Sequence, residues 1–87
     1  MRFRVLWLRV AIDALAQAYT QAAGEDRATE VTTDMALADQ VLAVNPQHVG
    51  ESRAGNERIF FLPTLALTYE VFDDEKLVVV ISARYRP

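Results

Sequence analysis

The sequence predicts one α+β domain, spanning residues 1–87, in which two helices cover a single face of a β-sheet. The hydrophobic period is two near the start, changes to helical spacing, and returns to two after residue 56. The resulting order is strand, helix, helix and three strands, so only one layer of helices is available to cover the sheet. With 87 residues, 52% of them hydrophobic, the chain can bury one modest core. It is too short for a two-domain enzyme, a doubly wound nucleotide-binding fold or a barrel.

The first strand and the first helix are separated by a change in period. Along residues 2–9 apolar and aromatic side chains occupy alternate positions, which is typical of a strand. Its two sides are formed by Phe3, Val5 and Trp7 and by Arg2, Arg4 and Leu6. From Ile12 to Ala23 apolar residues recur at steps of three and four, which predicts an alanine-rich amphipathic helix. Gly24 is expected to end this helix as a left-handed cap.

A second helix is predicted directly after a short turn. Glu25 and Asp26 place negative charge at its start, where the helix dipole favours it. Apolar residues from Val31 to Val44 form its buried face, and Asn45-Pro46 ends it because the residue before a proline avoids helical geometry. The two helices should therefore form an antiparallel hairpin.

The polar segment 47–56 predicts a loop, and three strands are expected after it, over residues 58–62, 64–72 and 76–86. In the last strand the alternate residues from Leu77 to Tyr85 are expected to pack on the helices. The opposite face of the sheet should be open to solvent. It is expected to carry Arg58, Phe60, Thr68, Glu70, Ser82, Arg84 and Arg86, joined by Arg2 and Arg4 if the first strand belongs to the same sheet.

Charge is divided unevenly along the chain. The net charge is −3, from nine cations and twelve acids, which argues against a protein that coats nucleic acid by bulk charge alone. Residues 10–51 hold seven acids and one cation, a balance of −6, whereas the remainder has a balance of +3. Eight of the nine cations are arginines, the side chain suited to bidentate phosphate contacts. A local arginine face can therefore meet an anionic partner, or it can simply solubilise an exposed sheet.

Several kinds of site and location are excluded by composition. With no cysteine and one histidine, His48, the chain offers no thiolate or multi-histidine metal site, and no metal or cofactor is expected. The longest apolar run, Leu77 to Ile81, is too short to span a membrane, and residues 1–10 do not form a signal peptide. We therefore expect a cytoplasmic protein without a membrane partner.

The order of elements and the residues within them resemble the RelE/ParE superfamily, the small toxins of type II toxin–antitoxin systems, which include plasmid stabilisation proteins. The resemblance covers nearly the whole chain. It rests chiefly on Phe3-Arg4-Val5-Leu6-Trp7, Val41-Leu42-Ala43-Val44-Asn45-Pro46, Gly50-Glu51-Ser52-Arg53, Tyr69-Glu70-Val71-Phe72-Asp73-Asp74 and Val78-Val79-Val80-Ile81. It implies a β-α-α-β-β-β chain with a helical hairpin packed on one face of a twisted, mostly antiparallel sheet. It also implies a cognate antitoxin that wraps the toxin.

Two activities are implied by this resemblance. Ribosome-dependent members cleave mRNA on a basic sheet face, whereas ParE-type members inhibit DNA gyrase and cleave nothing. The residues that the resemblance and the local pattern select as catalytic candidates for cleavage are Arg58, Arg86, Tyr85 and Glu70. The candidates for RNA binding are Arg53, Arg84 and Arg4.

The sequence departs from the nuclease pattern at three places. Ala66 and Phe60 occupy positions where basic residues are expected, and the C-terminal tyrosine has no counterpart unless Tyr85 substitutes for it. The leading hypothesis is an mRNA endoribonuclease that acts with the ribosome. The alternatives are a DNA gyrase inhibitor and a catalytically inactive binding module, the last as a homodimer joined through an exposed strand edge.

Overall fold

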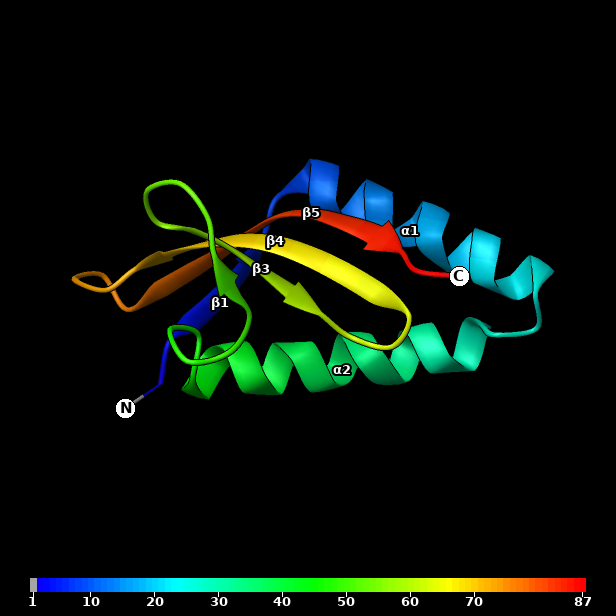
Figure 1. The fold of residues 1–87 in the computed structure, drawn as a ribbon, viewed down its shortest axis with the longest axis horizontal. Coiled ribbons are helices and arrows are strands. Elements are labelled where there is room, and N and C mark those ends of the chain that lie inside the picture. The colour runs from blue at the N-terminus through cyan, green and yellow to red at the C-terminus, as the bar shows by residue number, and fades with distance from the viewer. Residues whose placement is uncertain (1) are drawn as a thin grey trace.

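The computed structural model describes residues 2–87 and has the predicted order of elements, with one additional short strand (Figure 1). The elements are β1 (Arg4–Trp7), α1 (Arg9–Gly24), α2 (Ala28–Val44), β2 (Glu51–Ser52), β3 (Glu57–Phe61), β4 (Leu65–Phe72) and β5 (Leu77–Tyr85). The extra strand β2 lies in the segment predicted to be a loop, where it pairs with β3. The predicted α+β class, with a helical hairpin on a mostly antiparallel sheet, is confirmed.

The sheet has the strand order β1-β5-β4-β3-β2. β1 runs parallel to β5, with Val5 beside Val78, and the other pairings among residues 2–87 are antiparallel. β1 therefore forms one edge of the sheet and β2 forms the other. Figure 1 shows α1 and α2 meeting at their turn and diverging away from it.

A one-residue bulge interrupts the pairing of β4 with β5. Thr68 pairs with Ser82, whereas the next residue, Tyr69, pairs with Val80. Ile81 is therefore the extra residue on β5. An inserted residue exchanges the two faces of a strand beyond it, because side chains alternate with a period of two.

The bulge makes the predicted helix-facing set of β5 wrong in its first half. Side chains before the bulge face the helices at even positions, and those after it do so at odd positions. The buried side chains of this strand are Val78, Val80, Ala83 and Tyr85. Leu77 and Val79, which were expected under the helices, lie on the open face instead.

β3 presents Arg58 and Phe60 to the helix side, and their predicted place on the open face is wrong. Arg58 lies directly opposite Tyr69, and Phe60 lies opposite Leu67. Residues directly opposite in an antiparallel pair share a face, and Tyr69 and Leu67 are both fully buried. The side chains that β3 contributes to the open face are Glu57, Ile59 and Phe61.

The turn between the helices differs in detail from the prediction. Gly24 is the last residue of α1, and the left-handed residue is Asp26, with φ of 61°. Aspartate tolerates this conformation better than most side chains. α2 begins at Ala28, so Glu25 and Asp26 lie in the turn rather than at the start of the helix.

Small side chains let α1 lie close to the sheet, and one polar contact fixes α2. Ala11, Ala18 and Ala22 are the buried residues of α1, which packs mainly on β5. In α2 the buried carboxylate of Asp34 accepts hydrogen bonds from the backbone N–H of Thr64 at 2.8 Å and from its hydroxyl at 2.6 Å. This contact joins α2 to the turn between β3 and β4.

Candidate functional site

The open face of the sheet is largely apolar, and the two arginines that its strands place there lie at different ends. Arg4 on β1 and Arg84 on β5 are exposed on this face, as predicted. Glu57 and Glu70 lie directly opposite each other on β3 and β4, and Glu51 lies at the β2 edge. The other side chains on this face are Leu6, Ile59, Phe61, Ala66, Thr68, Phe72, Leu77, Val79 and Ser82. Within the strands, the expected arginine face is thus reduced to Arg4 and Arg84.

Arg58 is held at the rim of the helix side by the loop between α2 and β2. Its Nε donates to the carbonyl oxygen of Val49 at 3.3 Å, and its Nη2 donates to that of Gly50 at 3.2 Å. The neighbouring Tyr69 hydroxyl lies 2.8 Å from the carbonyl oxygens of Pro46 and Val49. Burial raises the pKa of the Tyr69 phenol, although the nearby Arg58 opposes the shift. Arg58 therefore uses two of its five N–H donors to shape a loop.

Tyr85 faces the helices rather than the open face. Its ring is buried, and the guanidinium carbon of Arg27 lies 5.8 Å from the ring centre. The Tyr85 hydroxyl donates to Oε1 of Glu25 at 2.7 Å and accepts from Nη1 of Arg27 at 3.2 Å. The hydrogen bond to Glu25, together with burial, raises the pKa of the Tyr85 phenol. Tyr85 is therefore a poorer proton donor than a free tyrosine, and it lies on the wrong side of the sheet for a ligand on the open face.

Arg86 lies just beyond β5, at the end of the sheet. Its Nη1 donates to the carbonyl oxygen of Leu62, and its backbone N–H donates to that of Thr64 at 2.8 Å. The guanidinium carbon is 5.2 Å from the ring centre of Phe61, which is 39% exposed. This stacked pair leaves an accessible aromatic edge and a cation at one corner of the open face.

Glu70 has an acidic residue as its direct neighbour on β3. Its cross-strand neighbours are Glu57 on β3 and Val79 on β5. Like charges directly opposite on antiparallel strands repel each other. Neither carboxylate takes part in an ion pair within residues 2–87. Arg53 pairs with Glu51 at 3.2 Å in the loop at the β2 edge.

The structure does not assemble the catalytic candidates into one site. Those candidates are Arg58, Arg86, Tyr85 and Glu70. The two on the helix side are separated along the sheet, because Arg58 is in register with Tyr69 and Tyr85 with Leu65, four positions away on β4. Glu70 lies on the open face, and Arg86 lies beyond the end of β5. These four residues therefore do not bring an acid and a base together beside a cluster of cations.

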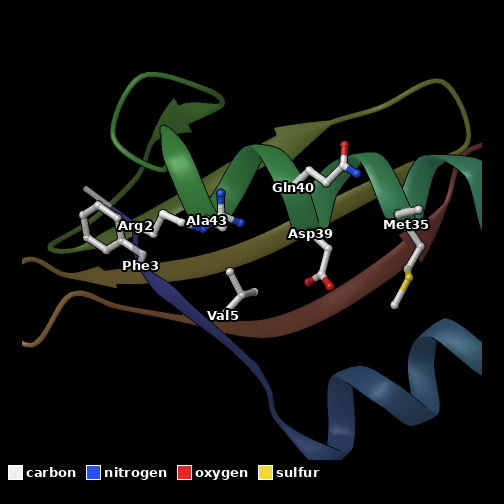
Figure 2. A pocket seen from close by; sticks show the side chains of 8 residues that line it. Arg2, Phe3, Val5, Met35, Asp39, Gln40 and Ala43 are labelled. Atoms are coloured by element: carbon white, nitrogen blue, oxygen red, sulfur yellow. The ribbon is translucent and has the colours of Figure 1, made fainter.

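A groove that the sequence did not indicate lies between β1 and α2 (Figure 2). It has a volume of about 500 Å³ and is lined by Arg2, Phe3, Val5, Met35, Ala36, Asp39, Gln40 and Ala43. The Phe3 N–H donates to the Ala43 carbonyl at 2.7 Å, and Nε1 of Trp7 donates to Oδ1 of Asp39 at 3.2 Å. Because β1 pairs with β5 on one side only, backbone groups of its alternate residues point to the other side. Such a groove suits an extended polypeptide better than a small molecule.

Two further surveys of residues 2–87 concern membranes and metals. No helix there is both long and apolar enough to cross a membrane. In the same residues, no three histidine, aspartate or glutamate side chains gather in a way that could hold a metal ion.

Comparison with known proteins bears on the fold. No protein-family model matches the sequence, and neither does any curated protein. The chain is similar to a chain of the RelBE2 toxin–antitoxin complex from Mycobacterium tuberculosis, with a TM-score of 0.77 and 18% identity over 99% of this chain and 93% of that one. It is also similar to a chain of the chromosomal ParDE toxin–antitoxin system from P. aeruginosa, with a TM-score of 0.76 and 16% identity over 98% of this chain and 97% of that one. The chain therefore has the fold of the RelE/ParE toxins.

Proposed function

We propose that this chain is the toxin of a toxin–antitoxin pair and that it acts by binding a protein target rather than by cutting RNA. The fold supports the first part, and a cognate antitoxin is the partner that belongs with it. The position of Tyr85 carries the second part. Its hydroxyl is engaged by Glu25 and Arg27 on the helix side, so it is not available to a phosphate on the open face.

RNA cleavage through the 2′-hydroxyl requires three groups around the phosphate, and the poor match of the candidate residues to these roles supports the proposal. A base must take the hydroxyl proton, an acid must protonate the leaving oxygen, and positive charge must surround the phosphorane. Arg84 and Arg86 supply charge at one end of the sheet. The one carboxylate considered as a base, Glu70, stands beside Glu57, and this pair repels a phosphate.

DNA gyrase is the target that we propose. The resemblance to ParE-type toxins suggests it, and one of the similar structures belongs to a ParDE system. The open face also suits a protein, because its exposed apolar side chains include Leu6, 51% exposed, and Phe61, 39% exposed. Apolar surface with aromatic residues is typical of the central part of protein interfaces.

The test measures supercoiling by purified DNA gyrase and cleavage of ribosome-bound mRNA with one preparation of the protein. We expect loss of supercoiling and intact mRNA. Leu6→Asp should weaken the inhibition, whereas Tyr19→Asp, at a residue equally exposed on α1, should not. Normal supercoiling together with cut mRNA would overturn the proposal.

Ribosome-dependent mRNA cleavage is the second candidate, and one observation favours it. Arg84, Arg86 and the exposed ring of Phe61 lie at the same end of the sheet, where they could contact a phosphate and a base. Under this function, induction in a bacterial host should cut mRNA and arrest growth, and Arg86→Ala should relieve both effects. Intact transcripts on strong induction would exclude it.

A further inference from the structure

On the open face of the sheet, a cation and a carboxylate lie at equivalent positions on opposite sides of Thr68. Thr68 is in register with Ser82 on β5 and with Ile59 on β3. Arg84 lies two residues after Ser82, and Glu57 lies two residues before Ile59. β3 and β5 run in the same direction, since each is antiparallel to β4. Arg84 and Glu57 therefore lie on opposite sides of Thr68, at similar distances from it.

We propose that two copies of this chain associate face to face through their open sheet faces, about a twofold axis that passes near Thr68. This axis places Arg84 of each copy over the Glu57–Glu70 pair of the other copy. The facing pair of carboxylates is unfavourable in a single copy, because both are in direct register and neither has an ion-pair partner within residues 2–87. A guanidinium from the second copy offsets that repulsion with charge-assisted hydrogen bonds.

Apolar side chains on the same face fit this axis as well. Leu6 lies two strands away from Thr68 and two residues further along the strand direction, which places it close to the twofold axis. Leu6 of one copy therefore contacts Leu6 of the other. Phe61 of one copy comes over Ile59 of the other, because the two residues lie on the same side of Thr68. Leu6 and Phe61 are among the large apolar residues that the single chain leaves exposed. Such patches on small proteins commonly mark interaction sites.

The arrangement belongs to a known class of sheet packing. The usual strand spacing and rise give an angle of about 70° between the strands of the two copies, which is closer to orthogonal than to aligned packing of sheets. The same dimensions give a footprint of roughly 20 by 20 Å, which is smaller than the ~800 Å² per partner of a standard interface. We therefore expect a weak, reversible dimer, with a dissociation constant in the micromolar range or above.

This dimer differs from one joined through a strand edge, because it leaves the β1 edge and the groove beside α2 free. It also hides Leu6, Phe61 and Arg84, so a target or an antitoxin that uses the open face must compete with it. The inference does not depend on the proposed function, since it concerns the purified chain alone.

Sedimentation equilibrium of the purified chain over a wide concentration range is the first test. We expect a monomer–dimer equilibrium that weakens as salt is added. Arg84→Glu places further negative charge at the carboxylate pair and should raise the dissociation constant at least about tenfold, a change of about 1.4 kcal/mol. The charge exchange Arg84→Glu with Glu57→Arg should restore association. A monomer at every concentration, or a dimer that is insensitive to Arg84→Glu, would overturn the proposal.

Cross-linking locates the axis. The chain has no cysteine, so Thr68→Cys introduces the single thiol of the molecule. Packed sheets lie about 10 Å apart, which is too far for a disulfide, so a bis-maleimide of similar length is the cross-linker. We expect it to link this variant into a dimer much faster than Gln17→Cys on the exposed side of α1. Equal rates for the two variants would contradict an axis near Thr68. Circular dichroism checks that each variant folds. If Thr68→Cys does not fold, the charge-exchange variant decides the question.

Discussion

At the level of single residues, polar side chains beneath the helices attach distant segments to one another. Asp34 accepts a hydrogen bond from Thr64, the Tyr69 hydroxyl donates one to the loop after α2, and the Tyr85 hydroxyl donates one to Glu25 in the turn between the helices. Each contact joins residues at least 23 positions apart in the sequence. Buried hydrogen bonds of this kind cost little when complete and much when one partner is lost. These residues should therefore dominate the response to single substitutions.

Asp34→Ala is expected to lower the free energy of unfolding by about 2–4 kcal/mol, because both donors of the buried Thr64 lose their acceptor. The matched control is Asp39→Ala, which removes one exposed hydrogen bond from Trp7 and should cost less than about 1 kcal/mol. Urea unfolding followed by circular dichroism measures both values. Similar losses for the two variants would show that Asp34 is not a buried anchor.

At the level of elements, the segment between α2 and β3 contains two glycines, one packed closely against β3 and one facing open space. Gly50 has φ of 70°, and a Cβ there would lie 2.5 Å from the carbonyl oxygen of Ile59. Gly55 has a similar φ of 62°, but a Cβ there would meet open space. The two glycines thus share a backbone conformation and differ in their surroundings.

Gly50→Ala should therefore destabilise the protein by at least about 3 kcal/mol, since backbone strain of about 1–2 kcal/mol is joined by a clash with β3. Gly55→Ala carries the strain alone and should cost about 1–2 kcal/mol. Thermal unfolding of the two variants under identical conditions gives the comparison. If Gly55→Ala were the more damaging change, the loop would not pack against β3 as described.

The pairing of β3 with β4 permits a stabilising change. Glu70→Lys replaces repulsion from Glu57 with attraction and should raise the free energy of unfolding by about 0.5 kcal/mol in dilute solution. Glu75→Lys, in the exposed turn after β4, makes the same charge change without a facing carboxylate and serves as the control. A loss of stability specific to Glu70→Lys would show that the two carboxylates do not face each other.

At the level of the whole molecule, the free energy of unfolding should fall at alkaline pH. The pKa of Tyr69 is raised by burial, and the pKa of Tyr85 is raised by its hydrogen bond to Glu25 and by burial. A raised pKa means that the folded chain holds the phenol proton more tightly than the unfolded chain. The resulting stabilisation is complete below the usual tyrosine pKa of about 10 and is lost as pH rises through the folded value. Urea midpoints should fall above about pH 10, and the Tyr69→Phe and Tyr85→Phe double variant should show a smaller decline.

Much of this fold was predictable because its patterns are local. Apolar residues occupy every second position from Leu65 to Val71 in β4, the change of period marks the helices, and Asn45-Pro46 ends α2 as expected. β3 lacks such a pattern, because the run from Ile59 to Leu62 is apolar throughout, so its faces are set only by register with β4. The bulge at Ile81 is likewise a property of a strand pair and has no signal in one strand.

The candidate site was less predictable, because the place of its residues depends on contacts between distant segments rather than on local patterns. Arg4 and Arg84 were placed correctly on the open face, and β1 keeps its alternation throughout. Arg58 depended on the register of β3 with β4, and it lies on the helix side instead of the predicted open face. Tyr85 lies on the helix side, as the alternation of the last strand predicted. The contact between Tyr85 and Glu25 spans 60 positions, and no spacing rule could have indicated it.

The parallel pairing of β1 with β5 also sets the order of events during synthesis. A ribosome produces β1 early, yet the strand beside it in the sheet is β5, which follows all the other elements. The helices can form as they emerge, because their hydrogen bonds are local. β1 must wait, with Val5 and Trp7 exposed to chaperones, until residues 77–85 have left the exit tunnel. A nascent chain that stalls before this point therefore lacks the strand with which β1 pairs.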